Sequence, residues 1–300
     1  MGGKKWIRHS LRQLRKMLQA KGVYLSHETI RHLLQQQEYS LKANRKSISE
    51  SVPDRDAQFR YIRRVKQLFI WAGYPVISVD SKKKELIGNF KNPGQAWKHQ
   101  PELVNVHDFP EEALVKAVPY GIYDVVHNLG YVYVGLSADT AEFAVDAILR
   151  WWQRQDRPQF PQETHLLILC DAGGSNGYRL RNWKRQLQNR LVDPFQIEVM
   201  VCHYPTGTSK WNPVEHRLFS FISINWAGQP LRSLPILLAL IRGTTTEAGL
   251  KVKAALLKKR YRKQVTVSQK EMNTLNIVHR RFCPHWNYLI KPRPQPPEKV

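Results

Sequence analysis

The sequence has few cysteines and no long apolar run. Its three cysteines, Cys170, Cys202 and Cys283, are widely spaced and lack the paired spacing of a zinc site or a disulfide framework, so we expect reduced, buried thiols. The longest apolar run, residues 234–241, is interrupted by Pro235 and is far too short to cross a bilayer. No signal-peptide apolar core stands near the N-terminus. The sequence therefore predicts no membrane segment and a cytoplasmic, nucleoid-associated location.

Acidic residues are also scarce, since 24 Asp and Glu stand against 47 Lys and Arg, which gives a net charge of +23. Residues 1–70 hold 16 basic and 5 acidic residues, residues 71–226 hold 16 of each, and residues 227–300 hold 15 basic and 3 acidic residues. Two basic flanks around a neutral, strand-rich middle favour double-stranded DNA as the partner, because neutralising phosphates releases condensed counterions. Ribosomal and membrane-surface proteins are basic as well, but they seldom have this division of charge.

The first 50 residues predict two short helices. Ser10 and Ser26 are suitable N-caps ahead of apolar positions at helical spacing, and Gly22 ends the first helix. Helix, tight turn and helix is the pattern of a helix-turn-helix DNA-binding module, whose second helix would present Arg31 and His32 to the major groove. A helical hairpin with a solvated basic face has the same pattern and remains the alternative.

Further along the chain, the spacing of apolar residues changes from helical to short β-branched runs. The predicted strands span residues 76–80, 121–126, 131–136, 166–171 and 196–203, and the predicted helices span residues 140–152, 178–191 and 213–226. We expect a basic linker helix over residues 51–72, an α/β catalytic domain over residues 73–228, a basic helical extension over residues 229–291 and a disordered tail over residues 292–300.

Three acidic residues stand where the predicted elements end or begin. Asp80 and Asp171 each close an apolar strand, and Glu215 opens the last predicted helix of the domain. Taken singly, each has a structural explanation: Asp is common where strands pass into loops, and Asn212, Pro213 and Glu215 fit a capping box. Taken together, an acid on the first strand, one on the fourth and one on the helix after the fifth predict a ribonuclease-H-like mixed sheet with flanking helices. Carboxylates this close need cations to offset their repulsion, which predicts two Mg²⁺ or Mn²⁺ ions and phosphoryl transfer.

Several segments resemble one family of mobile-element enzymes. The segments are VISVDSKKKELIGNFKN (residues 76–92), HDFPEEALVKAVPYGIYDVV (107–126), DTAEFAVDAILRWW (139–152), ILCDAGGSNGYRLRNWK (168–184) and GTSKWNPVEHRLFSFISINW (207–226). They are similar to insertion-sequence transposases of the ISAzo-thirteen family, and the similarity covers nearly the whole chain. The last segment also resembles the NPIE motif of mariner-like transposases.

This resemblance implies a DDE transposase in which Asp80, Asp171 and Glu215 form the catalytic triad. It implies cleavage at transposon ends, strand transfer into target DNA and a homodimer on the DNA. Members of the family usually have further DNA-binding helices before the position where this chain begins, so we expect a shortened copy. A non-catalytic DNA-binding protein derived from such a transposase, and a structure-specific nuclease of the same fold, are the alternatives.

Other polar residues near the predicted site are candidates for DNA contacts. Lys82, Lys83 and Lys84 follow the first acid and could grip phosphates, as could Lys210, although a solvated charge run is an equally good interpretation. The glycine-rich segment 173–177 lacks the Lys and Ser/Thr of a phosphate-binding loop, which excludes an ATPase of that type. His203 and His216 would lie near the acids, and Trp211 would either stack on a base or pack in the core.

Overall fold

The computed structural model describes residues 9–41, 54–106 and 113–294. The chain divides into two compact units, Met1–Ser51 and Val52–Val300, and each is described by itself. Residues 51–53 of the predicted linker helix and residues 295–300 of the predicted disordered tail lie outside the described residues.

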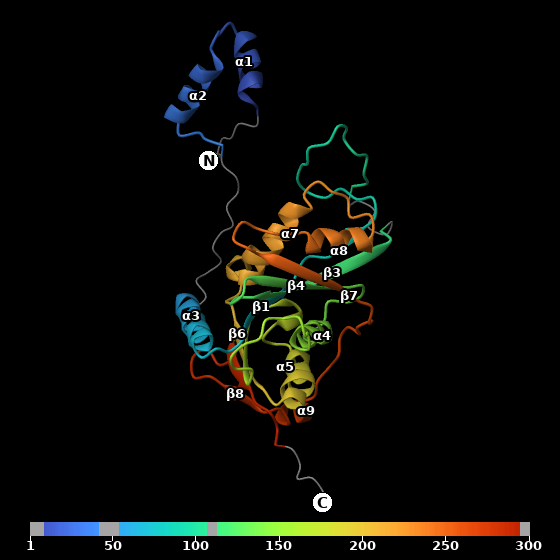
Figure 1. The fold of residues 1–300 in the computed structure, drawn as a ribbon. Coiled ribbons are helices and arrows are strands. Elements are labelled where there is room, and N and C mark those ends of the chain that lie inside the picture. Colours follow the sequence, from blue (N-terminus) through green and yellow to red (C-terminus); the bar gives the residue numbers. More distant parts are fainter. Residues whose placement is uncertain (1–8, 42–53, 107–112, 295–300) are drawn as a thin grey trace, which may run out of the picture. The chain divides into compact units, whose positions relative to one another are not determined.

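The first unit confirms the two predicted helices, α1 (Leu11–Gln19) and α2 (His27–Gln36), drawn in blue in Figure 1. The Ser10 hydroxyl accepts a hydrogen bond from the Gln13 amide, and the Ser26 hydroxyl accepts one from the Thr29 amide, so both serines are N-caps. Gly22 has φ +80° in the turn after α1, where the left-handed backbone favours glycine.

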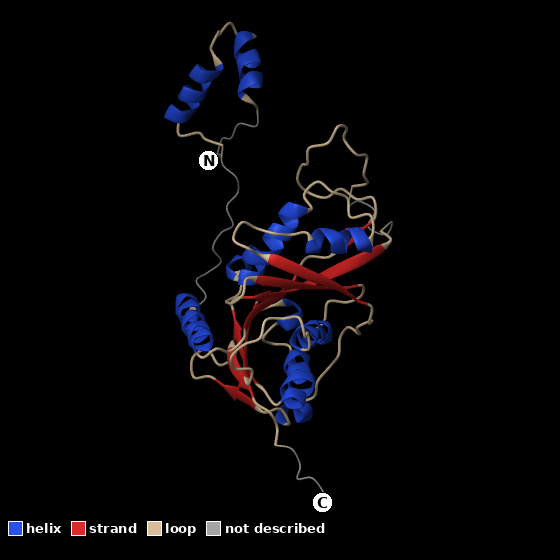
Figure 2. Cartoon of the chain, viewed as in Figure 1, coloured by secondary structure: helices blue, strands red, loops and turns tan. Residues whose placement is uncertain are grey.

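A mixed sheet forms the centre of the second unit (Figures 1 and 2), and it has nine strands among the described residues. The strands are β1 (Val76–Ser81), β2 (Glu85–Ile87), β3 (Val115–Asp124), β4 (Leu129–Gly135), β5 (His165–Cys170), β6 (Glu198–His203), β7 (Lys251–Leu257), β8 (Ile277–His279) and β9 (Asn287–Ile290). Their order is β7-β4-β3-β1-β5-β6-β9-β8, with β2 paired to β3. In the central part β3 runs antiparallel to β1 and β4, while β1, β5 and β6 are parallel. A mixed sheet with flanking helices was predicted, and the structure confirms this fold class.

Helices cover both faces of the sheet (Figure 2). They are α3 (Arg55–Trp71), α4 (Ala141–Trp152), α5 (Arg181–Leu187), α6 (Asp193–Phe195), α7 (Ser220–Asn225), α8 (Leu234–Arg242) and α9 (Gln269–Asn273), with 3-10 turns η2 (Gly174–Asn176) and η4 (Ser209–Trp211) and π-helical segments η3 (Gln188–Val192) and η5 (Glu215–Phe219). Helices α4 and α5 pack on one face, and α3, η5 and α7–α8 pack on the other. The strand period of two separates the faces: Ile77 and Val79 belong to the α4 core, whereas Val76 belongs to the α3 core.

The C-terminal region differs from the predicted helical extension. Residues 251–257 form β7, which pairs with β4, and β9 pairs with β6, so this region adds strands at both ends of the sheet. Residues 229–291 do contain α8 and the short α9. The prediction was wrong for β7 because Lys, Ala and Leu are good helix formers, and pairing with a neighbouring strand overrides that local preference.

Two elements also begin or end at residues other than those predicted. Strand β3 begins at Val115, six residues before the predicted start at Gly121, and it continues through Pro119. A proline inside a strand usually argues against one, which is why the sequence favoured a later start. The predicted helix 178–191 is α5 followed directly by the π-helical segment η3.

Candidate active site

The ends of β1 and β5 bring the two predicted catalytic aspartates to one edge of the sheet. These strands are parallel neighbours with Val79 opposite Cys170. Asp80 and Asp171 are each the next residue after this pair, one on each strand. Both line a pocket of about 340 Å³, whose other walls are the glycine-rich segment 172–174 and the loop residues 205–209. Open α/β sheets bind ligands at this carboxyl edge.

Glu215 reaches the same edge because the start of its helix is hydrogen-bonded to β1. The Ser78 hydroxyl accepts from the Val214 amide at 2.9 Å and donates to the Asn212 side-chain oxygen. The Asn212 side-chain amide in turn donates to the Asp171 carboxylate (Nδ2 to Oδ1, 3.0 Å) and to the Val79 carbonyl (3.3 Å). Ser78 and Asn212 therefore tie β1, Asp171 and the Glu215 helix together.

These contacts differ from the predicted capping box. The side chain that accepts from a first-turn amide is Ser78 of a distant strand, not Asn212, and no side-chain cap is formed by the residue before η5. The Asn212 side-chain amide instead donates hydrogen bonds to the Asp171 carboxylate and to the Val79 carbonyl of β1. The structural explanation of Glu215 as a capping residue is therefore wrong.

Two glycines let this helix approach the sheet closely. Gly121 of β3 lies opposite Asp80, and a Cβ added to it would stand 2.6 Å from the Phe219 ring. A Cβ on Gly130 of β4 would stand 2.4 Å from a Leu218 methyl group. Both distances are shorter than van der Waals contact, so side chains here would push the Glu215 helix away from the sheet.

The three carboxyl groups interact electrostatically. Burial, and then the negative charge of Asp171, raise the pKa of Asp80 to about 8, with a further contribution from Glu215. Burial and Asp171 also raise the pKa of Glu215, which accepts a hydrogen bond from the Asp80 carboxyl. Burial raises the pKa of Asp171, opposed by the hydrogen bond from Asn212. Raised pKa values on all three acids mean that negative charge at this edge is poorly compensated by the protein alone.

The donor set suits a hard divalent cation. Carboxylate oxygens are the ligands that Mg²⁺ and Mn²⁺ prefer, and Mg²⁺ in phosphoryl-transfer sites is usually held by one or two carboxylates together with water and substrate phosphates. In the described part of the chain, no group of three or more His, Cys, Asp or Glu side chains is spaced to hold a single ion.

Comparison with known proteins identifies a family for the chain. The family described as "Rhodopirellula transposase DDE domain" matches residues 1–292. The chain belongs to this transposase family. The predicted ISAzo-thirteen resemblance is thereby confirmed. Among proteins of curated function, none matches the sequence.

Solved structures of the Mos1 transposase are similar to this transposase. The Mos1 paired-end complex with left transposon end shares 15% identity at a TM-score of 0.45, covering 78% of this chain and 70% of that chain. The Mos1 strand transfer complex shares 15% identity at a TM-score of 0.44, covering 79% and 70% of the two chains. The Mos1 mariner paired-end complex with Mn shares 15% identity at a TM-score of 0.45, covering 78% and 70%.

Asp139 is an acidic residue of the site that the sequence did not single out. Its charge contributes to the raised pKa of Asp80, and its Oδ2 accepts a hydrogen bond from the Ser81 hydroxyl at 2.7 Å. Its other carboxylate oxygen is buried and has no hydrogen-bond partner among the described residues. Asp139 stands between β4 and α4, where an N-terminal capping role looks sufficient, so only the fold reveals its proximity to Asp80.

The predicted DNA-binding lysines are not equivalent. Lys82 is largely buried, pairs with Glu85 (Nζ to Oε1, 2.6 Å) and lies over the Trp226 ring, so it is already engaged within the transposase. Lys83 and Lys84 are exposed. Lys210 is exposed with its ammonium 5.5 Å from the centre of the Trp211 ring.

The predicted groove-reading residues of α2 are also exposed. Arg31 pairs with Glu28 at 2.6 Å on the surface of the helix, and His32 is its exposed neighbour. An exposed pair of this kind is weak, so Arg31 remains available to a phosphate.

His203 and Trp211 take places that the sequence left open. His203 is fully buried, its Nδ1 lies 2.9 Å from the Asp171 carbonyl, and its Nε2 lies 3.1 Å from the Tyr288 hydroxyl. Burial lowers the pKa of His203 to about 4, so a neutral ring supports the backbone of Asp171. His216 is exposed. Trp211 is 55% exposed and packs edge-on against Phe59, so it is not a core residue.

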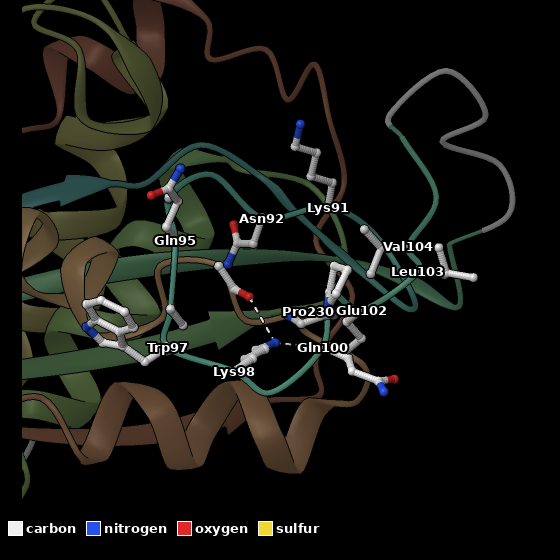
Figure 3. Close-up of a pocket in the computed structure, with 14 residues that line it drawn as sticks. Lys91, Asn92, Gln95, Trp97, Lys98, Gln100, Glu102, Leu103, Val104 and Pro230 are labelled. Carbon is white, nitrogen blue, oxygen red and sulfur yellow. Dashed lines mark hydrogen bonds and ion pairs between the residues drawn. The ribbon is translucent and has the colours of Figure 1, made fainter.

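A larger pocket, of about 880 Å³, is shown in Figure 3. Its walls come from residues 91–104 and from Gly228 and Pro230. Trp97 and Leu103 stand on this segment with almost fully exposed side chains. None of the predicted catalytic or DNA-binding residues lines this pocket. Within the described residues, no helix of the transposase is long and apolar enough to cross a membrane.

Proposed function

We propose that this protein cleaves DNA at transposon ends and joins the cut strand to target DNA, with Asp80, Asp171 and Glu215 as the catalytic acids. The observation that carries the proposal is the convergence of these acids from β1, from the end of β5 and from η5 on one edge of the sheet, where Asp80 and Asp171 line a pocket. The raised pKa values of all three acids, to which the charge of Asp171 contributes at Asp80 and Glu215, and the family membership support it.

In this proposal the carboxylates hold two Mg²⁺ or Mn²⁺ ions, which when bound activate the attacking oxygen and stabilise the leaving oxygen at phosphorus. Asn212 fixes the orientation of Asp171 through the hydrogen bond to its Oδ1. The Ser81 amide fixes Asp80 by donating to its Oδ1 at 2.8 Å. Positions fixed in this way cost little reorganisation when substrate binds.

DNA is proposed to approach over the exposed basic residues. Lys83, Lys84 and Lys210 would contact phosphates near the pocket, while Arg31 and His32 of the N-terminal unit would contact the major groove. These roles are supported by charge and exposure, because a Lys or Arg that pairs with a phosphate must be accessible.

The test is Asp171→Asn in the full chain, with Asp56→Asn, an exposed acid of α3, as matched control. We expect Asp171→Asn to lose Mg²⁺-dependent cleavage of DNA that carries the end repeats of the element, which are to be identified as inverted repeats in the DNA around the gene, while its DNA binding stays the same or improves. A joined product from the unsubstituted protein separates a transposase from a structure-specific nuclease. Metal-dependent cleavage retained by Asp171→Asn would remove this residue from the triad, and no cleavage by the unsubstituted protein would favour a non-catalytic DNA-binding protein.

A homodimer on DNA is part of the proposal. The exposed Trp97 and Leu103 side chains supply apolar surface of the kind that protein contacts bury. Sedimentation of the protein with and without end-repeat DNA should give a mass of two chains per DNA-bound assembly. A complex with one chain would contradict the dimer.

A further inference from the structure

A second groove adjoins the pocket of the predicted catalytic acids. We call it the side groove. It has a volume of about 290 Å³, and the residues that line it include Asp139, Ser175, Asn182, Arg262, Lys263 and Val265. Gly174 lines both cavities, so the two share a wall. Asp139 also connects them, because it lines the side groove and accepts a hydrogen bond from Ser81, a residue of the catalytic pocket.

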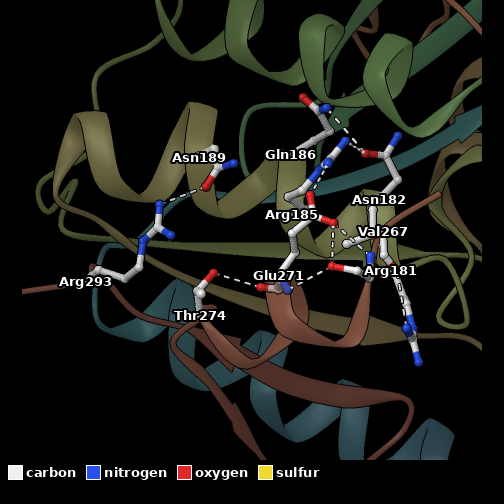
Figure 4. Close-up of polar contacts among 10 residues, drawn as sticks. Arg181, Asn182, Arg185, Gln186, Asn189, Val267, Glu271, Thr274 and Arg293 are labelled. Atoms are coloured by element: carbon white, nitrogen blue, oxygen red, sulfur yellow. Dashed lines mark hydrogen bonds and ion pairs between the residues drawn. The ribbon is translucent and has the colours of Figure 1, made fainter. Parts of the chain in front are cut away.

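The basic wall of the side groove is a segment fixed at both ends. Before it, the Tyr261 side chain is buried, its hydroxyl donates to the Asp146 carboxylate at 2.5 Å, and its amide donates to the Ser137 hydroxyl at 3.1 Å. After it, Arg181 of α5 donates to the Val267 carbonyl at 3.2 Å (Figure 4). Residues 262–266 between these anchors are exposed, so the loop presents its side chains from a held backbone.

Helix α5 forms the opposite wall and is held against the same part of the chain. Arg185 donates to the Glu271 carboxylate at 2.7 Å and to the Asn182 side-chain oxygen at 2.9 Å (Figure 4). With its oxygen engaged in this way, Asn182 has its amide hydrogens to offer at the groove. An amide donor facing two cationic side chains suits an anion with several acceptor oxygens.

The charge of the groove points to phosphate. Among the described residues neither Arg262 nor Lys263 has a carboxylate partner, whereas the nearby Lys259 pairs with Glu142. The lining set holds two cations and one acid, Asp139, so its formal charge is positive. A positive groove beside a strongly acidic site matches a DNA strand whose reacting phosphate lies at the acids and whose next phosphates need cationic partners.

We infer that the side groove holds the sugar–phosphate backbone of the DNA strand adjoining the reacting phosphate, through Arg262, Lys263 and Asn182. The inference rests on the proposed DNA chemistry. It assigns to the loop after β7, which lies within the C-terminal basic flank, a substrate-positioning role close to the acids in addition to general attraction of DNA.

The first test compares two double substitutions in the full chain. Arg262→Ala with Lys263→Ala removes both groove cations, and Lys258→Ala with Arg260→Ala removes two exposed cations of the same segment that do not line the groove. Binding to a fluorescein-labelled duplex of mixed sequence with a single-stranded extension is measured in EDTA over a series of salt concentrations. The logarithm of the binding constant falls as the logarithm of the salt concentration rises. Losing two phosphate contacts should make this slope shallower by about 1.4 to 1.8, and the control pair should leave the slope unchanged. Equal changes in both double variants would overturn the inference.

A second measurement does not depend on removing charge. The photocrosslinking residue benzoylphenylalanine replaces Val265 in the groove or, as control, Val278 on β8, and the two positions are similarly exposed at 37% and 41%. We expect crosslinks to the extension strand from position 265 and none from position 278. Absence of crosslinks at position 265 would overturn the inference. Because both measurements are made without metal, a protein that binds in the groove but never cleaves would contradict the proposed function and leave the groove assignment standing.

Discussion

The Asp80 carboxyl group couples the chemistry of the pocket to the stability of the fold. Burial and the charge of Asp171 raise its pKa to about 8, so the folded, metal-free protein keeps a proton there that the unfolded chain releases near pH 4. Because the folded state then binds more protons, stability falls as pH rises through this window, by at most about 1.4 kcal/mol per pH unit. Asp80→Asn should remove this loss.

The measurement is the melting temperature in EDTA at pH 5 and pH 8, for the unsubstituted protein, Asp80→Asn and the exposed control Asp56→Asn. The unsubstituted protein and the control should lose stability between the two pH values by more than Asp80→Asn does. Mg²⁺ should restore stability at pH 8 only where Asp80 is present. The same pH response in all three proteins would contradict the raised pKa of Asp80.

Glu215→Gln separates a charge requirement from a packing requirement. Glutamine keeps the size of the side chain and its ability to accept a hydrogen bond, but it removes one of three interacting negative charges. We expect metal-dependent cleavage to fall by orders of magnitude, while the melting temperature without metal stays the same or rises, since burial and Asp171 disfavour the charged form of Glu215. Glu247→Gln, at an exposed position, is the control. Cleavage by a folded Glu215→Gln protein at the level of the control would remove Glu215 from the triad.

At the scale of single residues, the sequence indicated the three acids because each stands at a strand end or helix start. Asp139 and the true partners of Asn212 were not predictable in this way. The Asp139–Ser81 contact joins residues 58 positions apart, and the Asn212–Asp171 contact joins residues 41 positions apart. Local propensity carries no information about such pairs, and the capping pattern at Asn212 pointed to a nearer and incorrect partner.

The approach of one helix to the sheet sets the position of Glu215. Gly121→Ala would bring a methyl group to 2.6 Å from the Phe219 ring, so η5 must shift outward. We expect a loss of about 1 to 3 kcal/mol in stability and a fall in cleavage of more than about tenfold, because small displacements of catalytic groups are costly. Combining it with Phe219→Leu, which frees space at the clash, should recover part of both. Additive losses in the double variant would contradict the steric explanation.

Whole elements were predicted best where their pattern was strongly periodic. Helices α1, α2, α3 and α4 and strands β1, β5 and β6 lie close to the predicted positions. Strands β7 and β9 were missed, since a strand added at the end of a sheet depends on the neighbour it pairs with more than on its own composition. The consequence is practical: a fragment ending at residue 228 would leave β4 and β6 each with one unpaired edge, and would not report on the complete sheet.

At the scale of the whole molecule, the basic flanks should supply most of the affinity for DNA. The unit Val52–Val300 is the fragment to compare with the full chain, since it keeps the complete sheet. We expect weaker duplex binding by the fragment and a shallower salt dependence, because the deleted residues 1–51 hold 11 basic and 3 acidic residues.

A full-chain variant with Arg12→Gln, Arg15→Gln and Lys16→Gln keeps α1 while removing three exposed charges, and it distinguishes lost charge from lost surface. If charge is the cause, this variant should lower the salt slope by up to about 2.7 and weaken binding to all duplex sequences alike. An unchanged slope in the variant, together with full-strength binding by the fragment, would contradict a contribution from the N-terminal flank. The DNA contacts would then lie in the second unit, which holds the C-terminal flank, the side groove and the exposed lysines beside Asp80.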